Sequence, residues 1–263
     1  MVLQYKEYGD INLPLMVFIH GGGVSGWMWD KQVEYFSNYH CLVPDMPEHG
    51  KSGNEKLFTI NLSAEKIIQL IEEKSKGKPV IAIGFSLGAQ VLISILSMRP
   101  YLIDYAIINS ALVRPIPFSK MLTKSLTLTY PLVKNKTFSK IQAKSMYIDE
   151  NYFDTYYQEC CHLNKASFVR IMEENMAFKI PNNFKNSSSK ILVTVGEKER
   201  SIMKKSLVDI VKSNSNCKGI ILPKVGHGIS LAKPDFFNKL IEDWVQNDIL
   251  SDNNKEISCL YPN

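Results

Sequence analysis

Hydrophobic positions in this chain fall into short continuous runs that alternate with longer segments of helical spacing. Six runs predict buried strands, each followed by a turn or a glycine loop: LMVFIHGGG, HCLVPDM, PVIAIGFS, IDYAIINSA, KILVTVGEK and KGIILPKVGHG. Strands that are hydrophobic on both faces and separated by helices are typical of a parallel sheet covered on both sides. We therefore expect an α/β fold whose functional residues lie at the carboxyl ends of the strands.

Segments of helical periodicity lie between these runs. The segment NLSAEKIIQLIEEKSKG predicts a helix with Asn61 or Ser63 as its N-cap and Gly77 where it stops. SLGAQVLISILSMRP predicts a mostly apolar helix, and KPDFFNKLIEDWVQNDIL predicts a closing amphipathic helix with Pro234 in its first turn. Residues 251–263 show no such pattern, and we expect them to be loosely ordered.

Residues 112–188 interrupt the alternation of strands and helices. They contain no convincing strand and four helical patterns: PFSKMLTKSLTLTYPLVK, TFSKIQAKSMY, DENYFDTYYQECCHL and KASFVRIMEENMAFK. They also carry eleven Lys and Arg against six Asp and Glu, so this segment holds the whole net charge of the chain, +5. We expect a helical lid here, inserted into an α/β core that residues 1–111 and 189–263 form.

Composition and charge favour a globular protein over a membrane-spanning or nucleic-acid-binding one. Of the 263 residues, 45% are hydrophobic and 22% charged, which is ordinary for a soluble globular protein. The mild net charge does not indicate nucleic-acid binding, and no hydrophobic run approaches a membrane span. The five cysteines are scattered and odd in number, and the N-terminus lacks a signal-peptide pattern, so we expect a cytoplasmic protein. No CxxC or HExxH motif occurs, so we expect neither a metal nor a cofactor.

The stretch IGFSLG holds the strongest chemical signal in the chain. A strand that ends at Gly84 and a helix that begins after Ser86 require a very tight turn, and bulky residues two positions either side of Ser86 would clash there. Glycines at both positions leave the serine hydroxyl exposed above the sheet, with a helix N-terminus behind it. The spacing therefore predicts that Ser86 is a nucleophile on a strand–turn–helix elbow.

A serine nucleophile needs a base, and the base needs an orienting acid. VGHGIS supplies His227 directly after the last predicted strand, and VTVGEKER supplies Glu197 and Glu199 after the strand before it. Both segments lie where the order serine, acid, histidine requires them. The sequence therefore predicts a Ser86–His227–glutamate triad.

The motifs HGGG, PDMPEHGKSG, GFSLG, VTVGEKER and VGHG, in this order, resemble those of the α/β-hydrolase superfamily. The resemblance covers essentially the whole chain outside 112–188 and implies an α/β-hydrolase fold. It places the acid three residues after the glycine of G-x-x-D, where this chain has Glu199 in place of the usual aspartate; Glu197 is the second choice. Together with the mechanism, it also points to the backbone N–H groups of Gly22 and Leu87 as the oxyanion hole.

Several other side chains have simpler expected roles. Trp27 and Trp29 follow the glycine loop, and packing beneath it is favoured over substrate contact. Packing is also favoured for the adjacent Cys160 and Cys161 beside His162, over metal or redox chemistry. The aromatic residues of 112–188 and its methionines are expected either to line an apolar pocket or to form a small core of the lid; these methionines are Met121, Met146, Met172 and Met176.

The predicted function is that of a carboxylesterase-like α/β-fold hydrolase. Ser86 would attack a small to medium ester-type substrate, and an acyl-enzyme would then react with water. Alternatives remain: a lyase, synthase or carbon–carbon bond hydrolase that resembles menaquinone-pathway enzymes, or a triad-bearing ligand-binding regulator. A lipase-like enzyme at lipid surfaces is least favoured, because no long basic amphipathic face with Trp is present. We expect a small-molecule partner, no nucleic acid, no membrane insertion, and a monomer or homodimer.

Overall fold

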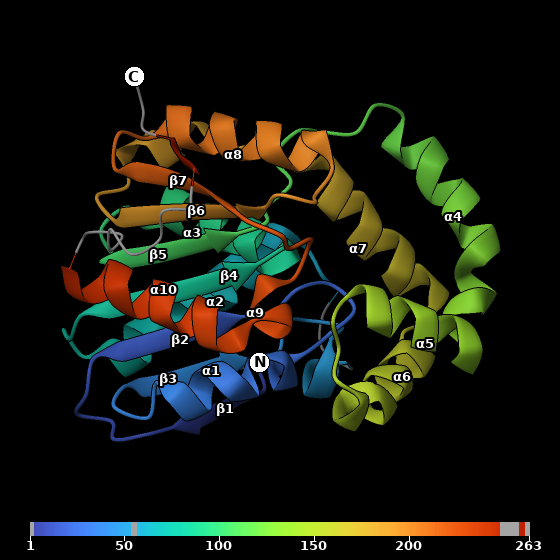
Figure 1. The fold of residues 1–263 in the computed structure, drawn as a ribbon, viewed down its shortest axis with the longest axis horizontal. Helices are drawn as coiled ribbons and strands as arrows, with labels where there is room; N and C mark the ends of the chain where they lie inside the picture. Colours follow the sequence, from blue (N-terminus) through green and yellow to red (C-terminus); the bar gives the residue numbers. More distant parts are fainter. Residues whose placement is uncertain (1–2, 54–56, 248–257, 261–263) are drawn as a thin grey trace.

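The computed structural model describes residues 3–53, 57–247 and 258–260, and the strands in them form a single sheet (Figure 1). In chain order these strands are β1 (Tyr5–Tyr8), β2 (Leu15–Ile19), β3 (His40–Pro44), β4 (Val80–Phe85), β5 (Tyr105–Asn109), β6 (Lys190–Gly196), β7 (Cys217–Leu222) and β8 (Ser258–Leu260).

The sheet has the spatial order β1-β3-β2-β4-β5-β6-β7-β8. The six strands from β3 to β7 in this order are parallel, while β1 pairs antiparallel with β3 and β8 pairs antiparallel with β7. All six strands expected from the hydrophobic runs are present, and the predicted α/β class with a mostly parallel sheet is confirmed.

Helices cover both faces of this sheet (Figure 1). The α-helices are α1 (Asp30–Tyr35), α2 (Ile60–Ser75), α3 (Leu87–Met98), α4 (Ser119–Val133), α5 (Lys136–Ser145), α6 (Phe153–His162), α7 (Lys165–Ala177), α8 (Ser201–Ser213), α9 (Ile229–Ala232) and α10 (Pro234–Asn247). Short 3₁₀ helices are η1 (Gly26–Trp29), η2 (Gly50–Ser52), η3 (Glu150–Tyr152) and η4 (Asn182–Asn186).

The alternation of side chains along β2 divides the hydrophobic core in two. Leu15, Val17 and Ile19 pack on one face of the sheet, in a cluster with residues of α2, α3 and α8. Met16 and Phe18 pack on the other face, in a cluster with residues of η1 and α10. All five β2 side chains are completely buried. Both faces of a central strand are therefore covered, as expected for a parallel sheet between two helical layers.

Strand order reverses beside β2. The chain passes from β2 to β3 on one side of it and then to β4 on the other. At such a switch point the loops that leave the two neighbouring strands run in opposite directions and open a crevice at the carboxyl ends. Ile19, at the end of β2, is level with Gly84 near the end of β4. The HGGG loop and the Ser86 elbow therefore begin side by side at this crevice.

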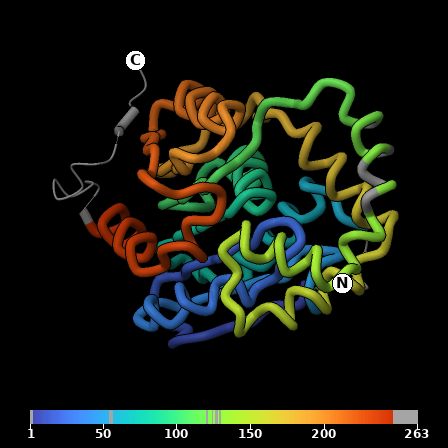
Figure 2. Tube along the Cα trace, turned by 45° about the vertical axis from the view of Figure 1, so that its right-hand side comes forward, coloured from blue at the N-terminus to red at the C-terminus, as the bar shows by residue number. Residues whose placement is uncertain are grey.

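The segment between β5 and β6 is helical, and the described residues in it contain no strand. Its helices α4 to α7, which we call the helical insert, lie on the opposite side of the molecule from α10 in both Figure 1 and Figure 2. Two asparagines begin helices within it: the side chain of Asn135 accepts the N–H of Phe138, and that of Asn164 accepts the N–H of Ser167. Such N-caps satisfy backbone donors that have no partner inside the helix.

Three local expectations differ from the structure. Helix α2 is capped by Thr59, whose hydroxyl accepts the N–H of Leu62, and Asn61 and Ser63 lie inside the helix. Strand β1 was not expected, because its four residues are mostly exposed at a sheet edge and show no hydrophobic run. Within the tail 251–263, residues 258–260 pair with β7 as β8, which satisfies backbone groups on that edge. The rest of the tail lies outside the described residues.

Candidate active site

Ser86 occupies a tight turn between β4 and α3. Its backbone has φ 53° and ψ −112°, a conformation that side-chain-bearing residues rarely adopt. A Cβ atom at Gly84 would lie 2.5 Å from the carbonyl oxygen of Gly88, and one at Gly88 would lie 2.3 Å from that of Ile19. Backbone atoms cannot yield as a flexible side chain can, so the turn requires glycine at both positions.

The structure brings Ser86, His227 and Glu199 together, although they are far apart in sequence. Nε2 of His227 lies 2.9 Å from Oγ of Ser86, and Nδ1 lies 2.8 Å from Oε2 of Glu199. Ser86 follows β4, Glu199 follows β6 and His227 follows β7. Because these strands are parallel, all three side chains lie at the carboxyl ends of the strands. His227 sits in a Gly-His-Gly turn, where Gly228 has φ 111°.

The hydrogen-bond partners define the protonation of this group. Burial alone would raise the pKa of Glu199, but hydrogen bonds and charge interactions with His227, the N–H of Gly196 and the hydroxyl of Ser110 outweigh it and lower the pKa below the ordinary value. An ionised carboxylate can only accept, so Nδ1 of His227 carries the hydrogen. In the neutral imidazole, Nε2 is then the acceptor that faces the hydroxyl of Ser86.

Ser110 is a member of the site that the sequence analysis did not identify. Its hydroxyl donates a hydrogen bond of 2.7 Å to Oε1 of Glu199, and the N–H of Gly196 donates one of 2.8 Å to the same oxygen. Ser110 directly follows β5 and has φ 57°. The sequence feature that could have identified Ser110 is its position directly after the predicted strand that became β5, next to β6.

The second candidate acid, Glu197, lies elsewhere. Its side chain accepts the N–H of Lys224 at 2.8 Å, and the residue is exposed. The structure thus places Glu199, and not Glu197, against His227.

Gly22 and Leu87 both line the same cavity as Ser86. Leu87 is the first residue of α3, so its N–H has no acceptor within that helix. The loop that carries Gly22 is held by the buried His20, whose Nδ1 is 2.8 Å from the carbonyl oxygen of Gly21. Nε2 of His20 accepts the N–H of Met46 at 2.9 Å. His20 therefore ties the loop after β2 to the end of β3.

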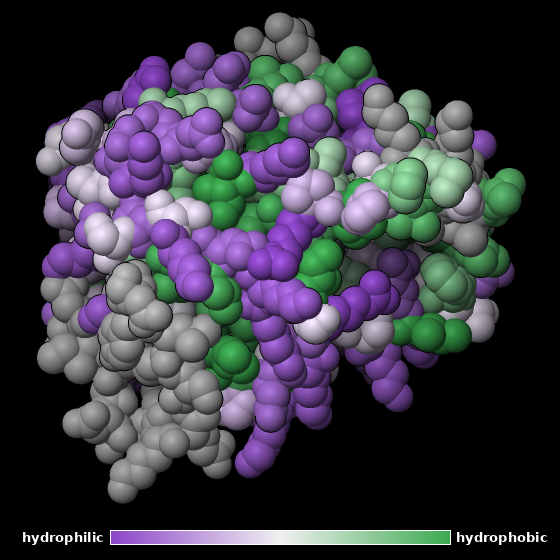
Figure 3. Space-filling view, turned by 90° about the horizontal axis from the view of Figure 1, so that it is seen from above, coloured by the Kyte–Doolittle hydropathy of each residue, from purple (hydrophilic) through white to green (hydrophobic). Residues whose placement is uncertain are grey.

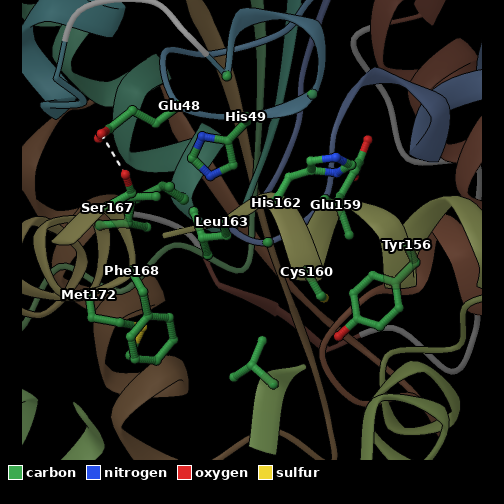
Figure 4. Close-up of a pocket in the computed structure, with 18 of the residues that line it drawn as sticks. Glu48, His49, Tyr156, Glu159, Cys160, His162, Leu163, Ser167, Phe168 and Met172 are labelled. Atoms are coloured by element: carbon green, nitrogen blue, oxygen red, sulfur yellow. Dashed lines mark hydrogen bonds between the residues drawn. The ribbon is translucent and has the colours of Figure 1, made fainter. Parts of the chain in front are cut away.

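A cavity of about 450 Å³ is lined by Ser86 and by residues of the helical insert. Figure 4 shows ten of its lining residues labelled, from Glu48 and His49 of the core to Phe168 and Met172 of α7. Core loops line one side of it, and residues of the helical insert from the end of α4 to α7 line the other. Residues of the insert in its wall are Val133, Gln142, Met146, Tyr156, Glu159, Cys160, His162, Leu163, Asn164, Ser167, Phe168, Ile171, Met172 and Asn175. Of the four methionines considered above, Met146 and Met172 line this cavity, Met176 is buried and Met121 is exposed.

Two carboxylates join the insert to the core beside this cavity. Glu159 of α6 accepts hydrogen bonds from Oγ of Ser25 at 2.6 Å and from Nε1 of Trp27 at 3.0 Å. Burial raises the pKa of Glu159, although these two bonds act in the opposite direction. Glu48 of the core accepts two hydrogen bonds from Arg170 of α7, at 2.8 and 3.0 Å. Figure 4 shows its bond to the hydroxyl of Ser167.

The two tryptophans adopt packing roles, while Cys160 and His162 lie in the wall of the cavity. Trp27 is buried and stacks on Tyr152, with 5.2 Å between the ring centroids, and Trp29 lies in the core against Phe18. Burial raises the pKa of the Cys160 thiol to about 11. Within the described residues, no group of three or more His, Cys, Asp or Glu side chains could hold a metal ion. Over the same part of the chain, every helix is too short or too polar to span a membrane.

Comparison with known proteins places these observations in context. A model of the alpha/beta hydrolase family matches residues 16–240. Monoacylglycerol lipase ABHD6 of Homo sapiens is 22% identical over 93% of this chain and 79% of its own length. A putative 2-succinyl-6-hydroxy-2,4-cyclohexadiene-1-carboxylate synthase of Haemophilus influenzae is 29% identical over 29% of this chain.

The extent of these matches differs. The chain spans 34% and 31% of the lengths of the first two curated relatives it matches. Among solved structures, MGS-M2, an alpha/beta hydrolase enzyme from a Medee basin deep-sea metagenome library, has a TM-score of 0.80 at 17% identity. That match covers 95% of this chain and 96% of the other. At this identity the similarity concerns the fold.

Proposed function

Because this chain belongs to the alpha/beta hydrolase family, we propose that it is a serine hydrolase that cleaves small to medium ester-type substrates. The observation that carries the proposal is the hydrogen-bonded series from Ser86 through His227 to Glu199, with distances of 2.9 and 2.8 Å. A hydroxyl, an imidazole and a carboxylate in this order are what nucleophilic acyl transfer needs.

The proposed reaction proceeds through an acyl-enzyme. His227 Nε2 takes the proton of the Ser86 hydroxyl as Oγ attacks the ester carbonyl, and Glu199 stabilises the imidazolium that forms. The backbone N–H groups of Gly22 and Leu87 would donate to the oxyanion, and such a donor typically contributes about 3 kcal/mol to transition-state stabilisation. The imidazolium then protonates the departing alcohol. Water repeats the sequence on the acyl-enzyme and releases the acid.

The cavity supports a substrate of limited size. At about 450 Å³ it lies in the range of small-molecule sites, and it combines apolar side chains such as Met172 and Phe168 with polar ones such as Glu159 and Asn175. We also propose that residues 112–188 act as a lid. The supporting observation is that residues of α5, α6 and α7 form the wall of the cavity opposite Ser86.

A fluorophosphonate probe, which labels activated serines covalently, tests the proposal. We expect the wild-type protein to be labelled and the Ser86→Ala variant not to be. Ser188→Ala, which removes an exposed hydroxyl bonded to the carbonyl of Pro100, is the matched control and should label fully. Turnover of p-nitrophenyl esters of increasing chain length should then show which acyl chains the cavity accepts. Labelling of Ser86→Ala at the wild-type rate would reject the proposed nucleophile.

A second candidate is a lyase or synthase reaction at the same site. It is favoured by the similarity to the Haemophilus influenzae protein, whose name describes a synthase. Here His227 would act as a base toward the substrate, and Ser86 would position it without forming an acyl-enzyme. Rapid turnover of short esters would favour the hydrolase. Full labelling of Ser86 together with no turnover of any ester would favour the second candidate.

A further inference from the structure

Helix α4 presents hydrophobic side chains to solvent along one face. Met121 is 67% exposed and Leu128 is 82% exposed, and Leu122 and Leu132 are also exposed. At 100° per residue these four positions lie within about a third of the helix circumference, and Phe118 just before the helix continues the row. The opposite side of α4 holds the buried Thr123. The apolar face of this helix is thus turned away from the protein.

Helix α5 follows α4 after a short turn and extends this surface. Ile141 is 66% exposed and Phe138 is also exposed, while Ser139 and Ala143 face inward. Figure 3 shows hydrophobic side chains gathered at its right, the side on which Figure 1 places α4 and α5. We call this surface the α4–α5 patch; it comprises Phe118, Met121, Leu122, Leu128, Leu132, Phe138 and Ile141. Exposed apolar surface in one continuous region is characteristic of an interaction site.

The segment of sequence that carries the patch has charge of a single sign. Between Asp104 and Asp149 the sequence contains no acidic residue and seven Lys and Arg. Lys140 and Lys144 lie one turn apart on α5, on either side of Ile141 in sequence, and both are exposed. Two carboxylates from other helices reach this segment, where Glu173 accepts a hydrogen bond from Thr123 and Asp154 pairs with Lys136. The lysines remain in excess, and apolar side chains among them match a partner that is both apolar and negatively charged.

A second copy of this chain fits the patch poorly. In a symmetric dimer the same patch would face itself, so lysines would meet lysines. A bilayer of anionic phospholipids offers the opposite: phosphate groups for the lysines and an acyl boundary for the apolar side chains. We propose that the α4–α5 patch docks this protein onto the surface of anionic phospholipid membranes.

The α4–α5 patch lies on helices that also line the Ser86 cavity. Val133, at the end of α4, and Gln142 and Met146 of α5 belong to the wall of the Ser86 cavity. Both helices that would contact the membrane thus also border the cavity, as α6 and α7 do. The sequence analysis found no single long basic amphipathic helix, because the α4–α5 patch is divided between two separate helices. Docking itself does not depend on chemistry at Ser86.

Co-sedimentation with vesicles tests the proposal. We expect the wild-type protein to pellet with vesicles of phosphatidylglycerol and phosphatidylcholine in equal parts, less so at high salt, and not with phosphatidylcholine alone. Each lysine near an anionic surface changes binding by roughly fivefold. The variant Lys140→Glu/Lys144→Glu should therefore bind at least about 25-fold more weakly. Met121→Asp/Leu128→Asp should lose binding to a similar extent.

Matched controls separate docking from other effects. Lys185→Glu/Lys212→Glu and Ile11→Asp/Tyr101→Asp change exposed residues outside the insert and should bind as wild type does. Ser86→Ala should also bind fully, so failure of the proposed chemistry and failure of docking give different results. All patch variants should turn over a soluble ester at the wild-type rate. Wild-type binding by the patch variants, or a patch-dependent dimer without vesicle binding in sedimentation velocity, would overturn the proposal.

Discussion

The hydroxyl of Ser110 donates a hydrogen bond of 2.7 Å to Oε1 of Glu199, the carboxylate whose other oxygen faces His227. The two residues are 89 positions apart. They meet because β5 and β6 are parallel neighbours, and each residue follows the end of its strand. The orientation of the carboxylate is thus fixed by groups other than the imidazole.

Replacing Ser110 by Ala should lower kcat by about tenfold and leave KM nearly unchanged, since hydrogen bonds to charged groups contribute roughly 1.5–3 kcal/mol. The bond also favours the ionised carboxylate, so its loss should raise the pKa of Glu199. The acidic limb of the kcat/KM profile should then move to higher pH. A fall in activity at all pH values alike, with no movement of that limb, would indicate a purely structural role.

Glu199 and Glu197 provide a direct comparison of the two candidate acids. The Glu199→Gln variant should lose about 10² to 10⁴ in kcat, because the imidazole loses the charge that stabilises its cation and holds its tautomer. Glu197→Gln should stay within about twofold of wild type, since the side chain of Glu197 bonds only the N–H of Lys224 among the contacts described. Steady-state kinetics on one p-nitrophenyl ester decides between them. The reverse pattern would assign the acid to Glu197.

Glu48 should make the stability of the protein depend on acid pH. Burial alone would raise its pKa, but hydrogen bonds from Arg170, Ser167 and the N–H of Phe58 outweigh burial and lower the pKa from 4.5 to about 2. A carboxyl whose pKa is lowered in the folded state stabilises it above the unfolded value, and this contribution is lost as the pH falls from 4.5 towards 2.

The Glu48→Gln variant should therefore melt roughly 3–8 °C below wild type at neutral pH. The difference should narrow below pH 4.5, where the wild type loses the same contribution. Thermal melts across the acid range measure this, with Glu34→Gln, an exposed residue, as control. A constant difference at all pH values would mean that Glu48 acts through packing and not through its charge.

Gly88 should tolerate no side chain. An added Cβ would lie 2.3 Å from the carbonyl oxygen of Ile19 and 2.4 Å from that of His20, so Gly88→Ala must displace backbone. We expect a loss of more than about 3 kcal/mol in the free energy of unfolding. At Gly22 the nearest atom is 3.4 Å away, in Leu87, so Gly22→Ala should cost less than about 1 kcal/mol. Urea unfolding of both variants compares them, and equal losses would contradict this account of the turn.

Features set by neighbouring residues could be predicted from the sequence. The six central strands and the glycine-flanked turn at Ser86 depend on a few adjacent positions. Helix ends were harder to predict. Thr59, Asn61 and Ser63 are all suitable N-caps, and only the hydrogen bond from the N–H of Leu62 identifies Thr59 as the cap. The roles of Ser86, His227, Glu199, Gly22 and Leu87 remain predictions.

Apart from those that the motifs indicated, contacts between distant parts of the chain could not be predicted. Motif position favoured Glu199 over Glu197, but which of the two contacts His227 depends on the path of the loop after β6. The bonds of Glu159 to Ser25 and Trp27 join residues more than 130 positions apart, and only the folded position of α6 brings them together. Ser110 is different, because it follows a strand that neighbours β6. Once the strand order is known, its position near Glu199 can be expected.

Asn109 of β5 pairs with Thr194 of β6, although the whole helical insert lies between them. The chain thus leaves the sheet and returns to the adjacent strand. The entropy cost of closing such an excursion rises only with the logarithm of its length. Lineages could therefore exchange, lengthen or trim this excursion without shifting strand register. One reactive centre could in that way serve many different molecules over evolutionary time.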